Sequence, residues 1–248
     1  MSPTYQNGPS TQVQKEESLG PYMDLPFETS EYYDRQELLF SQLPSSSIVI
    51  IPTNERKTRS NDVGYPFRPN SYMLYLCGWK EDEGVFVAHN RNGTIESKLF
   101  VPPRDTTKEI WEGIRIGIEG AESWPVHTTS SIEDFESEIT QIIGQFDNVY
   151  TILGISKELD KICNAVEGLS DPRTILDPMR RVKSQDEIKH MQEAATIAST
   201  AHKLAMKNAT PGMGEWEIQS YVEGHFMRSK STWSFPSIVG GGSNATIL

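Results

Sequence analysis

Cysteines, long apolar runs and any recognisable export signal are scarce or missing in this sequence of 248 residues. The two cysteines, Cys77 and Cys163, cannot form a disulfide framework and lack the spacing of a zinc site, so both are predicted to be buried thiols. No apolar run approaches the ~20 residues that a membrane-spanning helix needs, which excludes a bilayer span. The first residues have neither the basic start nor the apolar stretch of a signal peptide, and we expect a cytoplasmic location.

Positive charge is also in short supply. Against 34 aspartates and glutamates there are 23 lysines and arginines, and the net charge of -11 opposes binding to nucleic acid or to an anionic membrane. Hydrophobic residues make up 36% of the chain, which is enough for a globular protein with a real core. An acidic enzyme or a cation-binding protein fits this balance better than a nucleic-acid-binding protein.

Familiar catalytic patterns are absent from the sequence as well. The five histidines show neither H-E-x-x-H nor H-x-H spacing, so they predict no metal site by themselves, and no G-x-S-x-G is present. The glycines at 240–242 lack the lysine and the helix start of a phosphate-binding loop, and a tight turn between strands is expected there. The acidic run Glu81–Glu83 has the chemistry to bind a cation, but such runs are more often solvated loops.

Hydrophobic periodicity organises the first part of the chain. Residues 1–20 are polar and rich in Pro, Gly, Ser and Gln, which predicts a disordered tail. Residues 21–174 alternate short strands with helices, which indicates an α/β layer fold around a largely buried sheet. Asn92-Gly93 is a hairpin signal inside this part. Strands are predicted at 47–52, 72–77, 84–89, 97–101 and 149–153, and helices at 32–43, around 109–111, at 131–146 and at 157–166.

The remaining part, residues 175–248, begins with a joint and continues with two long helices. At the joint, Ser184 and Glu187 form a capping box, in which the serine hydroxyl accepts from the third helical N–H and the carboxylate accepts from the cap N–H. Apolar spacing predicts one helix that ends before Thr210 and a second over about 216–226. Residues 235–248 indicate an apolar strand, a glycine turn and the start of another strand, which would leave an unfinished sheet edge.

One further pattern, a group of charged residues around a tryptophan, is a candidate site. It consists of Arg104, Asp105, Glu109, Trp111, Gly113, Arg115 and Gly117. The charged groups flank the tryptophan within about one helical turn, and the glycines end that turn. The pattern predicts either an ion-paired corner that rigidifies a loop beside a partner surface or a functional site, and the sequence leaves both open.

These residues resemble the N-terminal signature of one family, the aminopeptidase P branch of the metal-dependent pita-bread peptidases. The stretch 65–79, which reads Y-P-F-R-P-N-S-Y-M-L-Y-L-C-G-W, is similar to the same signature. The joint at 180–188, the Thr-Pro-Gly-Met link at 210–213 and the turn that follows Ile-Val-Gly at 238–240 resemble the family's catalytic domain. The resemblance runs from about Tyr32 to Leu248.

The resemblance implies a fold and an activity. It implies a creatinase-type N-terminal α/β domain with a mixed sheet over 21–174, followed over 175–248 by the incomplete start of an α+β pita-bread domain. The implied activity is that of a Xaa-Pro aminopeptidase, which removes the first residue from peptides with proline second, and the implied assembly is a homo-oligomer. In such enzymes two manganese ions, held by two Asp, one His and two Glu, share a hydroxide that attacks the peptide carbonyl.

No catalytic residue and no metal ligand of the family is identified in this chain, because its last residues precede the expected first histidine. Only Phe235 falls on a pocket position, where relatives place an aromatic residue near the substrate; a buried strand aromatic is the alternative. We therefore expect a C-terminally truncated portion of the enzyme that is inactive alone. A non-catalytic protein-binding or oligomerisation module is the alternative from another class. Creatinase and a prolidase-type dipeptidase are nearer alternatives, although the Trp111 pattern favours aminopeptidase P.

Overall fold

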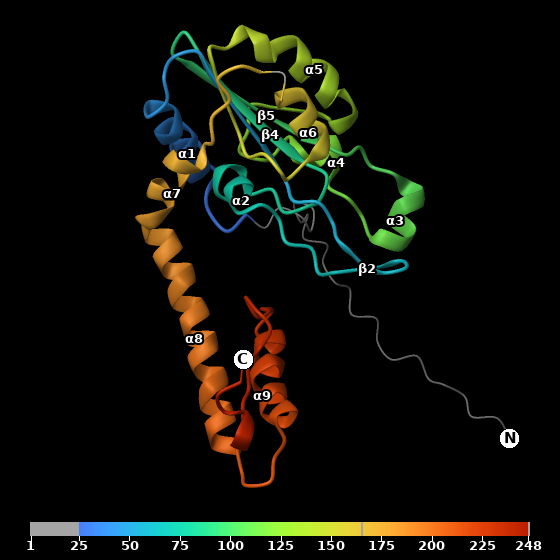
Figure 1. Cartoon of the computed structure of the whole chain (residues 1–248), viewed down its shortest axis with the longest axis vertical. Coiled ribbons are helices and arrows are strands. Elements are labelled where there is room, and N and C mark those ends of the chain that lie inside the picture. Colours follow the sequence, from blue (N-terminus) through green and yellow to red (C-terminus); the bar gives the residue numbers. More distant parts are fainter. Residues whose placement is uncertain (1–24, 165, 248) are drawn as a thin grey trace, which may run out of the picture. The chain divides into compact units, whose positions relative to one another are not determined.

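The computed structural model describes residues 25–164 and 166–247, so the tail predicted at 1–20 lies outside the described residues. The chain divides into two compact units, an N-terminal unit that ends at Met179 and a C-terminal unit that starts at Arg180 (Figure 1). The boundary expected between 174 and 175 falls inside helix α7 (Arg173–Arg181), which spans the division. In the described part of the chain, no helix is both long and apolar enough to cross a membrane.

A five-stranded mixed sheet forms the centre of the N-terminal unit, as the resemblance implied. The strands lie in the order β6-β5-β4-β1-β7. The pairs β1–β4 and β4–β5 are antiparallel, whereas β1–β7 and β5–β6 are parallel. Parallel neighbours need long crossover connections, and helices occupy them here. The strand bounds are β1 (Ser47–Pro52), β4 (Val85–Arg91), β5 (Thr94–Val101), β6 (Thr128–Ser131) and β7 (Asn148–Thr151).

Helices cover both faces of this sheet. All six residues of β1 are buried, and successive side chains of a strand point to opposite faces. Val49 and Ile51 pack in a core with α1 (Thr29–Ser41), α2 (Ser71–Cys77) and α7. Ile48 and Ile50 pack in a second core with α5 (Phe135–Ile142) and α6 (Lys157–Cys163). The unit is therefore a three-layer α/β sandwich, in agreement with the predicted fold class (Figure 1).

The predicted hairpin between β4 and β5 is confirmed. Arg91 pairs with Thr94, which leaves Asn92 and Gly93 as a two-residue turn. Both have positive φ, 55° and 87°, and that backbone conformation suits Asn and Gly in a turn whose twist matches the strands. The Gly93 N–H also donates to the Asn90 side chain over 3.0 Å.

The predicted strand at 72–77 is wrong, because this stretch forms helix α2. Its buried side chains are Met73, Leu76 and Cys77, a spacing of three and four that belongs to one helix face. The side chain of Asn70 caps the helix by accepting from Tyr72 N–H, and Gly78 ends it at φ 71°. A run of six apolar residues fits a buried strand and a buried helix equally, and only the caps decide between them.

Hydrophobic periodicity did not predict several short elements of the N-terminal unit. The predicted helix at 131–146 consists of α5 with a 3-10 turn at each end, η1 (Ile132–Asp134) and η2 (Ile143–Gln145). Helix α3 (Thr106–Glu112) was expected, and α4 (Gly117–Ala121), β6 and α7 were not. A small antiparallel pair, β2 (Thr58–Ser60) and β3 (Val63–Gly64), was also missed.

The C-terminal unit is a pair of helices, α8 (Gln185–Asn208) and α9 (Glu215–Arg228). The predicted capping box starts α8: Ser184 Oγ accepts from Glu187 N–H at 3.1 Å, and the Glu187 carboxylate accepts from Ser184 N–H at 2.9 Å. The strands predicted within 235–248 are wrong for the described residues, where a single 3-10 turn, η3 (Gly242–Asn244), is found. A strand requires a neighbouring strand to pair with, and the described part of this unit contains none.

Candidate functional site

The charged residues around Trp111 lie together at one corner of the N-terminal unit. Asp105 caps α3, and its carboxylate accepts from the N–H groups of Thr107 and Lys108 at 2.9 and 3.2 Å. The Arg104 guanidinium donates two parallel hydrogen bonds to the Glu109 carboxylate, at 2.9 and 2.7 Å. Bidentate pairs of this kind fix geometry as well as charge. The Asp105 cap and the Arg104–Glu109 ion pair therefore fix the first turn of α3 at both of its ends.

The Glu109 carboxylate is held in its charged form. Its side chain is only 7% exposed, and it also accepts from the Arg115 N–H at 3.1 Å. The hydrogen bonds from Arg104 lower the pKa of Glu109 to about 2, and the Arg115 N–H acts in the same direction against the opposing effect of burial. A general acid or base needs a pKa near the working pH. Glu109 is thus a locked ion-pair partner and not a proton-transfer group.

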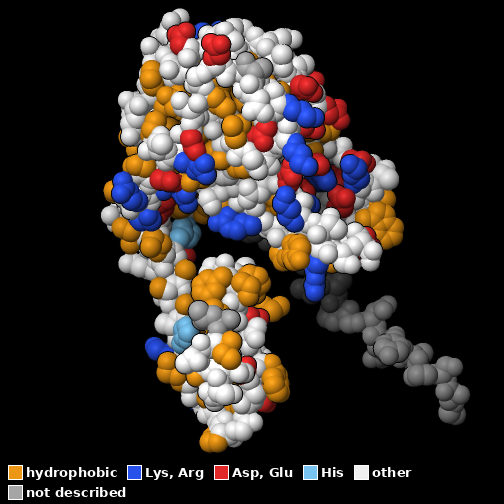
Figure 2. All heavy atoms as spheres, in the orientation of Figure 1, with side chains coloured by type: hydrophobic (Ala, Val, Ile, Leu, Met, Phe, Trp, Pro, Cys, Tyr) orange, Lys and Arg blue, Asp and Glu red, His pale blue; other side chains and the backbone are white. Residues whose placement is uncertain are grey.

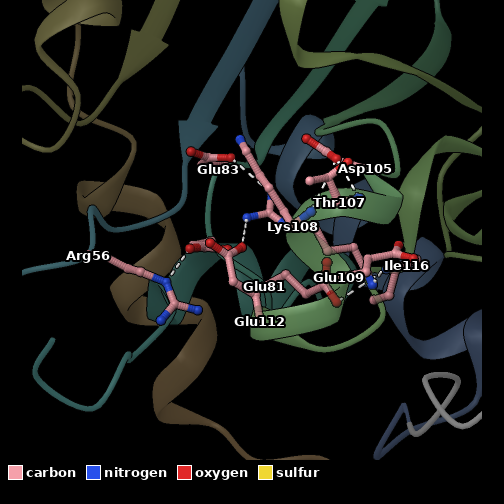
Figure 3. A network of polar contacts seen from close by, with 11 residues as sticks. Arg56, Glu81, Glu83, Asp105, Thr107, Lys108, Glu109, Glu112 and Ile116 are labelled. Carbon is pink, nitrogen blue, oxygen red and sulfur yellow. Dashed lines mark hydrogen bonds and ion pairs between the residues drawn. The ribbon is translucent and has the colours of Figure 1, made fainter. Parts of the chain in front are cut away.

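The acidic run Glu81–Glu83 completes this network from the loop before β4 (Figure 3). Arg115 binds Glu83 at 3.2 Å, and Glu81 accepts from the Ile116 N–H at 3.4 Å. Asp82 pairs with Arg56. Burial raises the pKa of Glu81, and the Ile116 N–H partly offsets that rise. The run forms a surface loop, as its charge predicted, and Glu83 is exposed. Cationic and N–H groups of the protein itself engage its carboxylates.

The corner supports an apolar tip on α3. Trp111 is 89% exposed, and its neighbours Ile110 and Ile114 are exposed as well; exposed apolar side chains are visible over α3 in Figure 2. Gly113 follows the helix at φ 88°. Gly117 has φ 69°, and a Cβ there would lie 2.5 Å from Arg104 Cγ. Positive φ favours glycine at both positions, and at Gly117 the close approach of Arg104 excludes a larger residue as well.

Phe235 lies on the wall of an apolar groove in the C-terminal unit. The groove has a volume of about 900 Å³ and is lined by α8, α9 and residues 231–240. Phe235 is 63% exposed among the described residues and lies outside any strand there. Its proposed contact with substrate stays a prediction. Side chains that line the groove from the helices include Ala198, His202, Ala205, Ile218, Val222 and Phe226.

A metal centre does not fit the described residues. No three or more His, Cys, Asp or Glu side chains within 25–164 and 166–247 are placed to share an ion. The carboxylates that do converge, at Glu81–Glu83 and Glu109, are engaged by arginines and backbone N–H groups. A dinuclear site needs a set of oxygen ligands directed at the ions, and this geometry does not supply one.

The two cysteines are buried thiols, as predicted. Burial raises the pKa of Cys77 to about 12 and that of Cys163 to about 11. Because the thiolate is the reactive form of cysteine, both side chains are inert packing groups.

Comparison with known proteins matches both halves of the chain. Residues 32–150 match the family model described as aminopeptidase P, N-terminal domain, and residues 189–248 match that of metallopeptidase family M24. A Xaa-Pro aminopeptidase of Haemophilus influenzae is 33% identical over 224 residues, which cover 88% of this chain and 52% of that protein. A mitochondrial intermediate cleaving peptidase 55 of Arabidopsis thaliana is 29% identical, over 88% of this chain and 45% of that protein.

A solved structure is similar as well. The low-pH form of aminopeptidase P from Escherichia coli superposes with a TM-score of 0.85 at 31% identity, over 90% of this chain and 55% of that one. The chain thus spans about half the length of the relatives it matches.

Proposed function

Because the chain belongs to the aminopeptidase P family of M24 metallopeptidases, we propose that it is the first part of a Xaa-Pro aminopeptidase. Such an enzyme releases the N-terminal residue from peptides whose second residue is proline. The observation that carries the proposal is the match of 90% of the chain to aminopeptidase P at a TM-score of 0.85. The family is one of metallopeptidases, which implies a divalent metal cofactor, and two manganese ions are our specific proposal.

We further propose that these 248 residues do not catalyse the reaction alone. Two observations support this: the chain covers 52% of the Haemophilus relative, and its described residues offer no metal-ligand cluster. Peptide is the proposed substrate, and neither nucleic acid nor membrane is a proposed partner of this acidic chain.

A chimera tests the activity. Residues 1–248 are fused to the part of the Haemophilus enzyme that continues beyond the match, and release of the first residue is measured with Xaa-Pro-Xaa and Xaa-Ala-Xaa tripeptides. We expect cleavage of the proline peptide only, dependent on added Mn²⁺ and lost on chelation. A folded chimera that ignores proline, or cleavage by the 248-residue chain alone, would contradict the proposal. An Xaa-Pro dipeptide in the same assay separates an aminopeptidase from a prolidase-type dipeptidase, which would cleave the dipeptide alone.

Assembly and location are finer proposals. We propose a homo-oligomer, which the exposed apolar tip of α3 supports, since large exposed apolar side chains mark interaction sites. The same tip is the observation that favours the alternative of a non-catalytic protein-binding or oligomerisation module. Light scattering of the parent chain and of Trp111→Ala tests self-association. A cytoplasmic location is proposed, and because the name of the Arabidopsis relative contains the word mitochondrial, imaging of a tagged chain in its source cells is the test.

A further inference from the structure

The two-residue turn between β4 and β5 presents a reactive pair of groups to solvent. Asn92 and Gly93 are both exposed, and a Cβ at Gly93 would have no atom within 4 Å. The Asn92 side chain carries a carbonyl carbon, Cγ, that the backbone nitrogen of the next residue can attack to close a five-membered ring. Glycine hinders this attack least, because no Cβ stands beside its nitrogen. Water has access to both groups.

The side chain of Asn92 is free to rotate. Its carboxamide has no hydrogen-bond partner among the residues that the structure describes. Other asparagines donate through Nδ2 to a carbonyl or carboxylate oxygen, namely Asn54, Asn70, Asn148, Asn208 and Asn244. A hydrogen bond of this kind keeps the carboxamide in one rotamer. Asn92 is not restrained in this way, so its Cγ can turn towards the Gly93 nitrogen.

Two further asparagines provide comparisons within the same chain. Asn164 is also exposed, but alanine follows it, and its Cβ hinders the attacking nitrogen. Asn61 has a positive φ similar to that of Asn92, 52° against 55°. However, its Nδ2 donates to Ser60 Oγ at 3.4 Å, and aspartate follows it. Within residues 25–164 and 166–247, no other pair combines exposure, an unbonded carboxamide and a following glycine.

One hydrogen bond restrains the attacking nitrogen. The Gly93 N–H donates to Asn90 Oδ1 at 3.0 Å. The nitrogen attacks only after it has lost its proton, and a hydrogen-bonded N–H loses its proton to solvent more slowly, as in amide exchange. This bond is itself exposed, so it opens without unfolding of the sheet. Asn90 therefore delays the attack and does not prevent it.

We propose that Asn92 is a site of spontaneous modification, at which its amide is converted to aspartate and isoaspartate. The deprotonated Gly93 nitrogen forms a bond to Asn92 Cγ, the Cγ–Nδ2 bond breaks, and Nδ2 takes up a proton and leaves as ammonia. Water then opens the resulting cyclic imide. Cleavage of the new bond to Cγ gives aspartate, and cleavage of the original peptide bond gives isoaspartate. One water is consumed, one ammonia is released, and no electron is transferred. The inference does not depend on the proposed function.

The two products differ in their effect on the hairpin. Aspartate keeps the original backbone, and Asp-Gly suits the same turn as Asn-Gly. In isoaspartate the main chain runs through Cβ and gains a carbon atom, within a two-residue turn that the pair Arg91–Thr94 closes. The added atom displaces that pair. Because β4 pairs with both β1 and β5, isoaspartate at position 92 weakens this end of the sheet.

Incubation of the purified 248-residue chain at mildly alkaline pH tests the proposal. A synthetic peptide with the sequence of residues 89–96 is the reference, and incubation continues until that peptide is fully converted. Peptide mapping by mass spectrometry measures the gain of about 1 Da at each asparagine, and enzymatic methylation of isoaspartate measures that product. We expect Asn92 to react at least about tenfold faster than Asn61 or Asn164, a ratio that corresponds to about 1.4 kcal/mol in activation free energy.

Variants separate the roles of the residues. Asn90→Ala should speed both amide exchange at Gly93 and conversion of Asn92 by at least about threefold, and Asn90→Asp, which keeps an acceptor, should restore the slow rates. Asn54→Ala removes an exposed hydrogen bond of 2.8 Å elsewhere in the unit, and as the matched control it should leave both rates unchanged. Asn92→Gly keeps a sequence that this turn accepts, and it should abolish the mass gain at this position without lowering the melting temperature.

Each result bears on a separate part of the proposal. The modification site is overturned if Asn92 is intact when the reference peptide is fully converted, or if Asn61 or Asn164 reacts as fast. An unchanged rate in Asn90→Ala refutes the restraining role of Asn90. Material enriched in isoaspartate should melt at a lower temperature than Asn92→Asp, and equal melting temperatures refute the effect on the sheet.

Discussion

Gln36 provides a sharp test of how the N-terminal unit is held together. Its side chain is 1% exposed, and Nε2 donates to the carbonyl oxygens of Leu76 and Pro125, both at 2.9 Å. Leu76 lies in the last turn of α2, where carbonyls lack helical partners. One amide thus joins α1 to the end of α2 and to the segment before β6.

Gln36→Leu should destabilise the unit by about 3 kcal/mol. The change leaves two buried carbonyls unsatisfied, at roughly 1–3 kcal/mol each. It also removes the Gln36 Oε1 atom, which is buried without a partner among the described residues, and this recovers about 1 kcal/mol. Equilibrium urea unfolding, followed by the fluorescence of the buried Trp79 and Trp124, measures the difference.

A matched variant controls this measurement. Gln42 also donates through Nε2 to a carbonyl, that of Leu38 at 3.1 Å, but it is exposed at the end of α1. Gln42→Leu should therefore change stability by no more than about 0.5 kcal/mol. If Gln36→Leu costs no more than Gln42→Leu, the two buried hydrogen bonds do not contribute as argued.

Three further predictions concern charge, capping and burial. In Glu109→Gln, the stability lost at neutral pH should shrink as pH falls from about 4.5 towards about 2. The depressed folded pKa of Glu109 stabilises the unit fully above about 4.5, and this contribution is lost progressively down to about 2. Urea unfolding at several pH values checks this, and a pH-independent loss contradicts it. Ser184→Ala should weaken the first turn of α8 by about 1 kcal/mol, seen as roughly fivefold faster amide exchange there and not in Ser199→Ala. Trp79→Ala should lower the free energy of unfolding by about 3–5 kcal/mol, whereas Trp111→Ala should change it by no more than about 0.5 kcal/mol. Calorimetric melts that rank the two variants in the reverse order refute the burial argument.

The fold was predictable wherever the signal is local. The Asn92-Gly93 turn and the Ser184 capping box depend on residues a few positions apart, and the structure has both. The stretch 72–77 failed because six consecutive apolar residues carry no period. Its helical state was nevertheless indicated by Asn70 and Gly78, which cap the two ends of α2. Such capping residues outweigh a composition that is typical of strands.

In the charged corner, too, only the contacts between residues close in sequence could be predicted. Arg104 and Glu109 are five residues apart, so both fall within the local pattern for which an ion-paired corner was one of two predictions. Their neighbours in the network, Glu81–Glu83, come from another loop, and only the tertiary fold brings Arg115 within 3.2 Å of Glu83. The strands expected at 235–248 failed for a similar reason, because a strand depends on a partner that periodicity cannot supply.

The position of β1 has a consequence for synthesis on the ribosome. This strand lies between β4 and β7, and Thr151 Oγ1 donates to the Ile50 carbonyl across 101 residues. The β1–β4–β5 meander is complete when Val101 emerges, but the other edge of β1 stays unpaired until β7 has been synthesised. At roughly 5–20 residues per second, the interval between Val101 and the end of β7 lasts roughly 2–10 s. During those seconds the nascent chain presents an unpaired strand edge with the sequence Ile-Val-Ile-Ile, which is the kind of segment that chaperones bind.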